Sequence, residues 1–365
     1  MVELNGYTLD GNWEPSPNGQ WVFATKDRNK YFIKTFRYPR YPNDTTSRIY
    51  AQRKKACDDW EKNQKLLISK LRSVAGPSGN VVVPVDLFRE GVSFYKVTLR
   101  VNTSTLSPKE IAMLPEEKEK LLLLKTMVGS IGALHRVQIV HGDLKPENIL
   151  ISRSESGNLI SKIIDFDDSY FEKKIPKAEM AIGTPNYYSP ELGKYVNEES
   201  ETLGEKITCK SDIFALGIIF HEYLTGNKPT NPKFPEEYTY CIVGNGSELM
   251  LDSSLSSGMI ALLKRMLHID PVERPDCGEV LVRLKEIEKN PVRLRHTSPA
   301  KKRVVVKPTL HRRPPINPTA VSGTDEIKRI TRISNNFKIE YESGKFVTVP
   351  YIYIKANKLE DRVEK

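Results

Sequence analysis

The segment at residues 141–150 reads HGDLKPENIL and brings a carboxylate, an amine and an amide close together. A further carboxylate follows downstream in the run IIDFD. Phosphoryl transfer needs a carboxylate beside the attacking hydroxyl, cations that neutralise the phosphates, and acidic or amide oxygens that hold Mg²⁺. A polar loop that caps a helix is the alternative, because acidic and amide residues also favour turns. The residues with the required chemistry are Asp143, Lys145, Asn148 and Asp165.

This segment and the Asp-Phe pair at Asp165 resemble the catalytic loop and the metal-binding motif of protein kinases. The resemblance implies that Asp143 is the catalytic base, which accepts the proton or orients the substrate hydroxyl, and that Lys145 contacts the transferred phosphoryl group. It also implies that Asn148 and Asp165 coordinate the metal. The implied cofactors are ATP and Mg²⁺, with Mn²⁺ as an alternative ion. The Lys-Pro-Glu run is closer to the serine/threonine branch than to the tyrosine branch.

Small-molecule kinases of the aminoglycoside and choline type also use a His-Gly-Asp loop with a downstream Asn, so later residues must decide the substrate. Residues 183–191, GTPNYYSPE, resemble the end of a protein-kinase activation segment, which forms a platform for a peptide. Residues 211–217, SDIFALG, resemble the buried helix whose Asp anchors the catalytic-loop backbone. Arg274 matches the family arginine that pairs with the Pro-Glu glutamate, here Glu191. These motifs favour a protein hydroxyl as the acceptor.

The elements that must position these groups begin with a β-rich region. Trp21–Ala24 and Tyr31–Phe36 predict a hairpin, and the chain from about Thr45 to Val74 lacks Pro and Gly and predicts a long helix. Val81–Phe88 and Ser93–Val101 predict two further strands. Together these segments predict a small sheet that carries one helix.

The rest of the chain up to about Lys289 is predicted to be mainly helical, beginning with a helix that starts at Pro115. The family resemblance implies an α+β, two-lobed protein-kinase fold over residues 1–290. The small β-rich N-lobe with its long helix would span about residues 1–101, and the larger, mainly helical C-lobe about residues 102–290.

The run YFIK that ends at Lys34 resembles the strand that bears the ATP-contacting lysine, although a solvated surface lysine is the alternative. Glu61 on the long helix is the expected partner of that lysine. The glycine-rich loop of the family is poorly matched, and Gly19 is the glycine expected to let the backbone approach phosphate. Val22 completes the predicted nucleotide contacts.

Several departures from the family pattern bear on activity. Phe32 stands where the family usually has Ala, and Asp167 replaces the Gly of Asp-Phe-Gly. Gly142 replaces the Arg before the catalytic Asp, so the resemblance is to kinases whose activity does not depend on a phosphate pairing with that Arg. A pseudokinase scaffold that binds nucleotide is therefore kept as the alternative function, with a small-molecule kinase behind it.

The net charge is +10, and residues 291–320 combine basic residues with prolines and hold no acidic residue. We expect a linker there, followed by a small terminal element over residues 321–365 with a hairpin formed by Phe337–Tyr341 and Lys345–Ile354. Thr and Ser residues of the linker are candidates for self-phosphorylation. Nucleic-acid binding through the linker is kept as a secondary alternative.

The chain shows no charged segment followed by a long apolar stretch, and no apolar run reaches the roughly 20 residues that cross a bilayer, so neither a signal peptide nor a membrane span is expected. The cysteines lack the CxxC spacing of zinc sites. A cytoplasmic location is the expectation, because scattered thiols suit a reducing compartment. These cysteines are Cys57, Cys209, Cys241 and Cys277.

Overall fold

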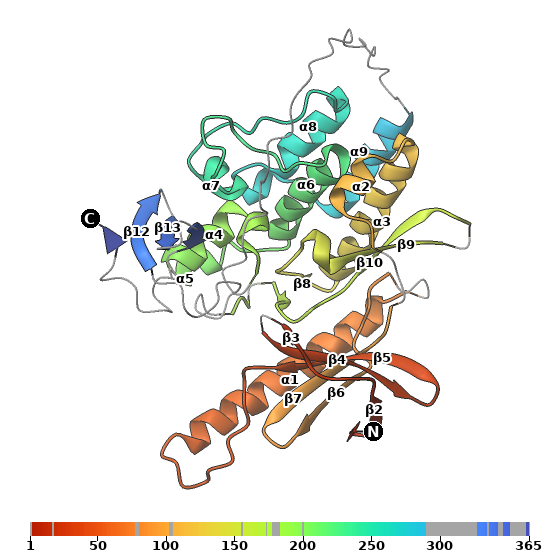
Figure 1. Ribbon diagram of the computed structural model, residues 1–365. Coiled ribbons are helices and arrows are strands. Elements are labelled where there is room, and N and C mark those ends of the chain that lie inside the picture. Colours follow the sequence, from red (N-terminus) through yellow and green to blue (C-terminus); the bar gives the residue numbers. More distant parts are fainter. Residues whose placement is uncertain are drawn as a thin grey trace, which may run out of the picture.

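The structure of the protein is a computed structural model (Figure 1). A β-rich lobe formed by the N-terminal residues lies against a larger lobe of helices. The predicted linker at residues 291–320 lies outside the described part of the chain. The described residues are 2–16, 18–76, 80–101, 105–154, 156–172, 174–176, 183–198, 201–289, 327–333, 336–341, 346–350 and 363–364.

The N-terminal lobe is built on a seven-stranded sheet with the order β1-β2-β4-β5-β7-β6, and β3 pairs with β4. The predicted hairpin is confirmed, because β4 and β5 pair antiparallel from Gly19 opposite Phe36 to Lys26 opposite Asn29. The strands are β1 Glu3–Leu4, β2 Tyr7–Leu9, β3 Glu14–Ser16, β4 Gly19–Lys26, β5 Asn29–Phe36, β6 Asp86–Glu90 and β7 Ser93–Leu99.

The predicted long helix is α1, Tyr50–Val74, which begins later than the predicted Thr45. The side chain of Asp44 accepts a hydrogen bond from the backbone N–H of Thr46 at 2.9 Å. Such local bonds offer the backbone an alternative to the helix, which accounts for the later start. Trp60 of α1 packs against Phe94, with ring centroids 4.9 Å apart, and this contact fastens the helix to the sheet.

The predicted strand Val81–Phe88 is shorter in the structure and begins at Asp86. The residues before it turn toward the helical lobe instead: Val81 forms a parallel bridge with Ile163, and the N–H of Val82 donates to the carbonyl of Ile163 at 2.9 Å. Pro84 has no N–H to offer a strand partner. This segment therefore joins the two lobes rather than extending the sheet.

The two faces of the sheet differ in what they cover. One face carries a cluster of buried apolar side chains that includes Val22, Ile33 and Val97. Because side chains alternate along a strand, the neighbours of Val22 and Ile33 point the other way, toward the helical lobe. Those neighbours include Trp21, Phe23, Phe32 and Lys34.

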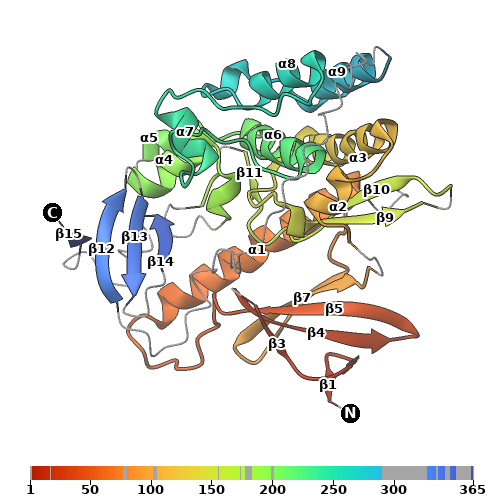
Figure 2. The same ribbon diagram turned by 45° about the horizontal axis from the view of Figure 1, so that its top comes forward.

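The second lobe is mainly helical, as predicted, and α6 lies at its centre with twelve of its sixteen residues buried. Figure 2 shows α6 beside α3 with α8 and α9 beyond them. Among the described residues, every helix is too short or too polar to cross a lipid bilayer. The helices are α2 Pro108–Ala112, α3 Glu117–Arg136, α4 Pro190–Glu198, α5 Glu201–Gly204, α6 Lys210–Thr225, α7 Thr239–Gly244, α8 Ser257–Met266 and α9 Cys277–Lys289.

Two short strand pairs lie where the helical lobe meets the sheet. They frame the segment that carries the candidate chemistry, because β8 directly precedes the HGDLKPENIL run and β9 begins with its last two residues. The pairs are β8 Ile139–Val140 with β11 Tyr170–Phe171, and β9 Ile149–Arg153 with β10 Leu159–Ile163.

The terminal element is a four-stranded sheet with the order β14-β13-β12-β15. The predicted hairpin is present as antiparallel β13 and β14, whereas β12 was not predicted. The isoleucines of β12 recur at every third position, which is not the alternation typical of a strand, and its register shifts after Ile327. The strands are β12 Ile327–Ile333, β13 Asn336–Tyr341, β14 Phe346–Pro350 and β15 Val363–Glu364.

Candidate active site

A buried carboxylate of α6 holds the backbone of the loop between β8 and β9 by hydrogen bonds. Asp212 accepts hydrogen bonds from the backbone N–H of His141 at 2.8 Å and of Gly142 at 3.3 Å. This confirms the anchoring residue predicted from the SDIFALG run. Asp212 also lies 3.0 Å from Nε2 of His135. Burial alone would lower the pKa of His135, but its hydrogen bonds to Asp212 and Cys277 raise the pKa to about 10.

Asp143 is the centre of a compact hydrogen-bonded group. Its Oδ2 accepts from Nζ of Lys145 at 2.6 Å, and its Oδ1 accepts from the hydroxyl of Thr184 at 2.8 Å. Lys145 also donates to that hydroxyl at 2.8 Å. The bonds hold the carboxylate, the amine and the end of the activation-segment motif together. Thr184 was not singled out from the sequence, although its place in the Gly-Thr-Pro run was the available signal.

Asn148 is oriented by the same loop. Its Nδ2 donates to the backbone carbonyl of Asp143 at 2.8 Å and to the carboxylate of Asp143 at 3.1 Å. The amide nitrogen is therefore occupied, and the amide oxygen is the atom left to face a cation. The N–H of Ile164 donates to the carbonyl of Asn148 at 3.0 Å, which ties the residue before Asp165 to this loop.

Asp165 has a left-handed backbone with a φ of 60°, an uncommon conformation for a residue other than glycine. Backbone strain of this kind is found where the surrounding structure holds a side chain in a working position. The carboxylate of Asp165 lies 3.0 and 3.1 Å from Nζ of Lys34, which reaches down from β5. The structure thus brings together Lys34 and Asp165, which are far apart in the sequence.

These oxygens suit Mg²⁺. Magnesium is usually held by one or two carboxylates together with the phosphates of a substrate, not by a cage made of protein alone. The described residues contain no cluster of three or more His, Cys, Asp or Glu side chains that could form such a cage. One carboxylate from Asp165 and one amide oxygen from Asn148, next to Lys34, match the shared kind of site.

A cleft of about 260 Å³ lies between the sheet and the helical lobe and includes Lys34 and Asp165 in its wall. Phe32 and Phe23 form part of its upper surface, and the ring of Trp21 stacks on Phe32 with centroids 5.3 Å apart. Aromatic rings occupy the side where the family usually has a small residue. The remaining described lining residues are Val82, Pro84, Lys96, Thr98, Leu99, Arg100, Val101, Leu150, Ile164, Phe166 and Asp167.

The structure corrects the prediction for Val22. This side chain is 1% exposed and packs with Leu4 and Tyr7 on the opposite face of the sheet. Val22 pairs with Ile33, the neighbour of Lys34, and alternation along the strand turns both away from the cleft. Trp21 and Phe23 are the β4 residues that share the face of Lys34.

Gly19 begins β4 and is not among the residues that line the cleft. A Cβ at this position would lie 1.9 Å from the backbone carbonyl oxygen of Thr35, so the close approach of β5 requires glycine here. This is a structural reason for the residue. A contact between Gly19 and phosphate stays a prediction.

The structure also corrects the prediction that Glu61 pairs with Lys34. Glu61 pairs with Lys65 along the surface of α1 at 2.6 Å, as expected for charges four positions apart on a helix. Lys34 instead lies 2.5 Å from Oδ2 of Asp167, and the other oxygen of Asp167 lies 2.6 Å from Nζ of Lys96. Neither contact was predicted.

Burial and neighbouring charges shift the pKa values of several side chains around Lys34. Burial alone would raise the pKa of Asp167, but the ammonium groups of Lys96 and Lys34 outweigh burial and hold the pKa well below its ordinary value. Burial would lower the pKa of Lys34, and the carboxylates of Asp167 and Asp165 raise it above its ordinary value. Burial is the largest cause that raises the pKa of Asp168 to about 7, and repulsion from the carboxylates of Asp143, Asp167 and Asp165 adds to it.

The backbone at Gly142, the position where the family has arginine, leaves no room for a side chain. Its φ is +83°, and a Cβ there would lie 2.5 Å from the backbone carbonyl oxygen of Asp168. A side chain of any kind would collide with this neighbour. The site is therefore built without an arginine that could pair with a phosphate on the activation segment.

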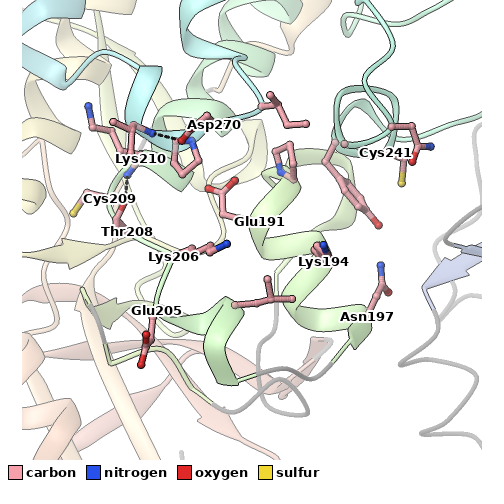
Figure 3. Close-up of a pocket in the computed structure, with 18 of the residues that line it drawn as sticks. Glu191, Lys194, Asn197, Glu205, Lys206, Thr208, Cys209, Lys210, Cys241 and Asp270 are labelled. Atoms are coloured by element: carbon pink, nitrogen blue, oxygen red, sulfur yellow. Dashed lines mark hydrogen bonds between the residues drawn. The ribbon is translucent and has the colours of Figure 1, made fainter.

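A second and larger cavity of about 1500 Å³ lies among α4, the start of α6, α7 and residues 269–272 (Figure 3). None of the residues of the Asp143 group lines it. Its wall includes Glu191, which forms a two-pronged ion pair with Arg274 at 2.7 Å per contact. Both side chains are buried, and the predicted pair is confirmed.

Comparison with known proteins identifies the same family that the motifs of the sequence resemble. The family model described as "Protein kinase domain" matches residues 43–283. Serine/threonine-protein kinase pkn2 of Myxococcus xanthus is 27% identical over 56% of this chain and 23% of its own length. Myosin light chain kinase A of Dictyostelium discoideum is 30% identical over 49% of this chain and 62% of its own. Serine/threonine-protein kinase PrkC of Bacillus subtilis is 36% identical over 41% of this chain and 22% of its own. The chain therefore spans between 22% and 62% of the length of these relatives.

Proposed function

Because this chain belongs to the protein kinase family, we propose that it is a serine/threonine protein kinase that transfers the γ-phosphoryl group of ATP to a hydroxyl of a protein. The observation that carries the proposal is the bonded group of Asp143, Lys145 and Thr184. A carboxylate, an amine and a hydroxyl are held within 2.8 Å of one another there. The relatives named serine/threonine-protein kinases support the same activity.

Each residue of the group has a role that its contacts support. Asp143 would accept or orient the proton of the attacking hydroxyl, and Lys145, bonded to it, would neutralise charge on the transferred phosphoryl group. Lys34 would bind the ATP phosphates from the sheet. Asn148 and Asp165 would hold Mg²⁺ through oxygen atoms, and the ion would neutralise the charge of the phosphates.

The acceptor is proposed to be a serine or threonine of a protein. Thr184 binds both Asp143 and Lys145, which links the catalytic carboxylate directly to the activation-segment motif. Just beyond, the buried pair of Glu191 and Arg274 fixes the start of α4 against the helical lobe. A firm surface next to the catalytic carboxylate suits a peptide chain better than a freely diffusing metabolite.

A reducing, cytoplasmic location is proposed on separate grounds. All four cysteines are free thiols, and Cys57, Cys241 and Cys277 are buried. Free buried thiols without disulfides suit the compartment in which ATP is supplied.

The test is to incubate the purified full chain with labelled ATP and Mg²⁺, with generic protein substrates in one arm and small hydroxyl metabolites in the other. Phosphorylated residues are then mapped by mass spectrometry. We expect phosphate on serine or threonine of protein. Binding of Mg²⁺-ATP without incorporation into any protein, the chain included, would indicate a nucleotide-binding pseudokinase, and phosphate only on a metabolite would indicate a small-molecule kinase.

A further inference from the structure

We propose that Asp167, held in place by Lys96, is the carboxylate that positions Lys34 for ATP, a task for which the sequence predicts Glu61 of α1. The inference rests on the proposed function, because it assigns Lys34 to nucleotide binding. It concerns a residue that departs from the family pattern, since Asp167 stands where the family has glycine.

The helix offers no carboxylate for this task. Every acidic residue of α1 forms an ion pair with a lysine of α1 four positions away, at 2.6 or 2.7 Å. Gln64 is the polar residue that α1 buries, and its Oε1 finds no hydrogen-bond partner among the described residues. A neutral amide cannot supply the negative charge that Lys34 needs. The acidic residues of α1 are Asp58, Asp59 and Glu61.

The pairing of β5 with β7 shows instead why Asp167 is needed beside Lys34. Lys34 of β5 stands directly opposite Lys96 of β7 in the antiparallel register, so the two side chains share one face. Two ammonium groups in that position repel each other, and the Lys96 side chain is 6% exposed, which leaves little water to solvate its charge. A carboxylate between them is required. Asp167 occupies that place, with one oxygen on each lysine.

Asp165 and Asp167 have different surroundings, which suit them to different roles. The Asp165 side chain is 36% exposed and faces the cleft, where it is available to a metal ion. Asp167 is 8% exposed, and its oxygens are already occupied by Lys34 and Lys96. If Asp165 were to hold Mg²⁺, its contact with Lys34 would weaken, and the contact of Lys34 with Asp167 would remain. Asp167 is therefore a positioning residue that acts through Lys34, not a residue that touches the reacting atoms.

A consequence for control follows from this arrangement. Lys34, Lys96 and Asp167 come from β5, β7 and the segment after β10, and none of them comes from α1. A displacement of α1 would leave the ion pair intact. Together with Gly142, which excludes the family arginine, the pair indicates an active site that needs neither a shift of α1 nor a phosphate on the activation segment to assemble.

The experiment measures Mg²⁺-ATP affinity by calorimetry, and the KM values for ATP and for a protein substrate, in full-length variants. Asp167→Asn removes the charge with little change of shape. Asp167→Glu keeps the charge. Glu61→Gln is the matched control, because it removes a partly buried carboxylate of α1 that pairs with Lys65 and not with Lys34. A double variant, Lys96→Met with Asp167→Gly, removes the positioning carboxylate together with the buried lysine that would otherwise be left unpaired.

We expect Asp167→Asn to weaken Mg²⁺-ATP binding and raise the KM for ATP by about tenfold to a hundredfold, the usual size for loss of a charge-assisted contact. The KM for the protein substrate should stay unchanged, Asp167→Glu should recover part of the affinity, and Glu61→Gln should behave as the wild type. Should Asp167→Asn fail to fold, the double variant gives the same readout.

A folded Asp167→Asn or double variant that binds Mg²⁺-ATP as tightly as the wild type, with the same KM, would overturn the inference and leave the contact as a structural one. Weakened ATP binding in Glu61→Gln would overturn it in favour of the helix. The wild type is assayed alongside for phosphate incorporation. If it incorporates none, the proposed function fails, while the nucleotide titrations still decide the role of Asp167.

Discussion

At the scale of single residues, two of the carboxylates at the site, those of Asp143 and Asp165, have contrasting surroundings. Asp143 is buried and accepts hydrogen bonds from Lys145, Thr184 and Asn148. Asp165 is more exposed and faces Nζ of Lys34. The first environment suits a group that orients a hydroxyl, and the second suits a ligand for a metal ion.

Asp165→Asn should therefore weaken ATP binding only when Mg²⁺ is present. The substitution removes one charged ligand from a hard cation that prefers oxygen donors. Calorimetric titration of ATP with and without Mg²⁺ measures the difference, and the wild type should show a larger gain from the metal than the variant. An equal gain in both proteins would reassign Asp165 to a structural role.

The sequence was sufficient to predict Asp143, Lys145, Asn148 and Asp165 as site residues. These four residues lie close together in the sequence, so a short motif contains them all. The pairing of Lys34 was not local. The ion pair of Lys34 depends on the register of β5 and β7, which places Lys96 opposite Lys34. It also depends on Asp167, which belongs to the helical lobe and contacts Lys34 across the cleft. No pattern within α1 or β5 could show that contact.

At the scale of elements, the helical lobe is held under the site by buried polar contacts. Arg274 is 1% exposed, and besides Glu191 it donates to the backbone carbonyl of His268 at 2.8 Å. Glu191→Gln would leave the guanidinium buried without its carboxylate, at a cost of about 3–5 kcal/mol in unfolding free energy. Glu286→Gln, at an exposed pair with Arg283, should cost less than about 1 kcal/mol. Equal losses in urea unfolding would contradict the account.

The contact between His135 and Asp212 makes stability depend on pH. The folded pKa of His135 is about 10, above its ordinary value of 6.5, so the contact stabilises fully below pH 6.5 and its contribution is lost as the pH rises through 10. Among the described residues, the thiol of Cys277 also faces the imidazole, with Sγ 3.5 Å from Nδ1. His135→Gln should therefore destabilise the protein more at about pH 6 than at about pH 9, by an amount of order 1 kcal/mol per pH unit. Urea unfolding of both proteins at the two pH values checks this, and a constant difference would show that the imidazole is neutral.

Element types were predicted better than their ends. The β4–β5 hairpin, α1 and the helical lobe follow from periodicity and from the placement of Pro and Gly. The late start of α1 follows from the side chain of Asp44, and the late start of β6 from the backbone bonds that Val81 and Val82 make with Ile163. Such competition between local and distant partners is not visible in a pattern of residue types. Strand β12 of the terminal sheet was not predicted, because its isoleucines recur at every third position and do not alternate.

At the scale of the whole molecule, the predicted basic linker at residues 291–320 follows α9 and precedes the terminal sheet. We propose that the kinase phosphorylates hydroxyls within the linker, which would offset about 1.5 to 2 positive charges per phosphate. A chain that ends at Lys289 should keep activity on a generic substrate and lose most self-incorporated phosphate. The candidate hydroxyls are Thr297, Ser298, Thr309 and Thr319.

Substitution of all four hydroxyl residues by Ala in the full chain is the companion variant, since it leaves the length and the terminal sheet unchanged. Phosphate mapped by mass spectrometry should fall in this variant while activity on the generic substrate is retained. An inactive or insoluble chain ending at Lys289 would show that the terminal residues belong to the catalytic core. Undiminished self-phosphorylation in the Ala variant would place the modified residues elsewhere.

The most direct test of the kinase assignment is Asp143→Asn, measured for both nucleotide affinity and turnover. The change removes the carboxylate that would orient the hydroxyl, but leaves Lys34, Asn148 and Asp165 in place. We predict Mg²⁺-ATP affinity close to that of the wild type and a rate of phosphate transfer to protein lower by about 10² to 10⁴, the usual contribution of a general base. Full phosphate transfer by a folded Asp143→Asn protein would contradict the account.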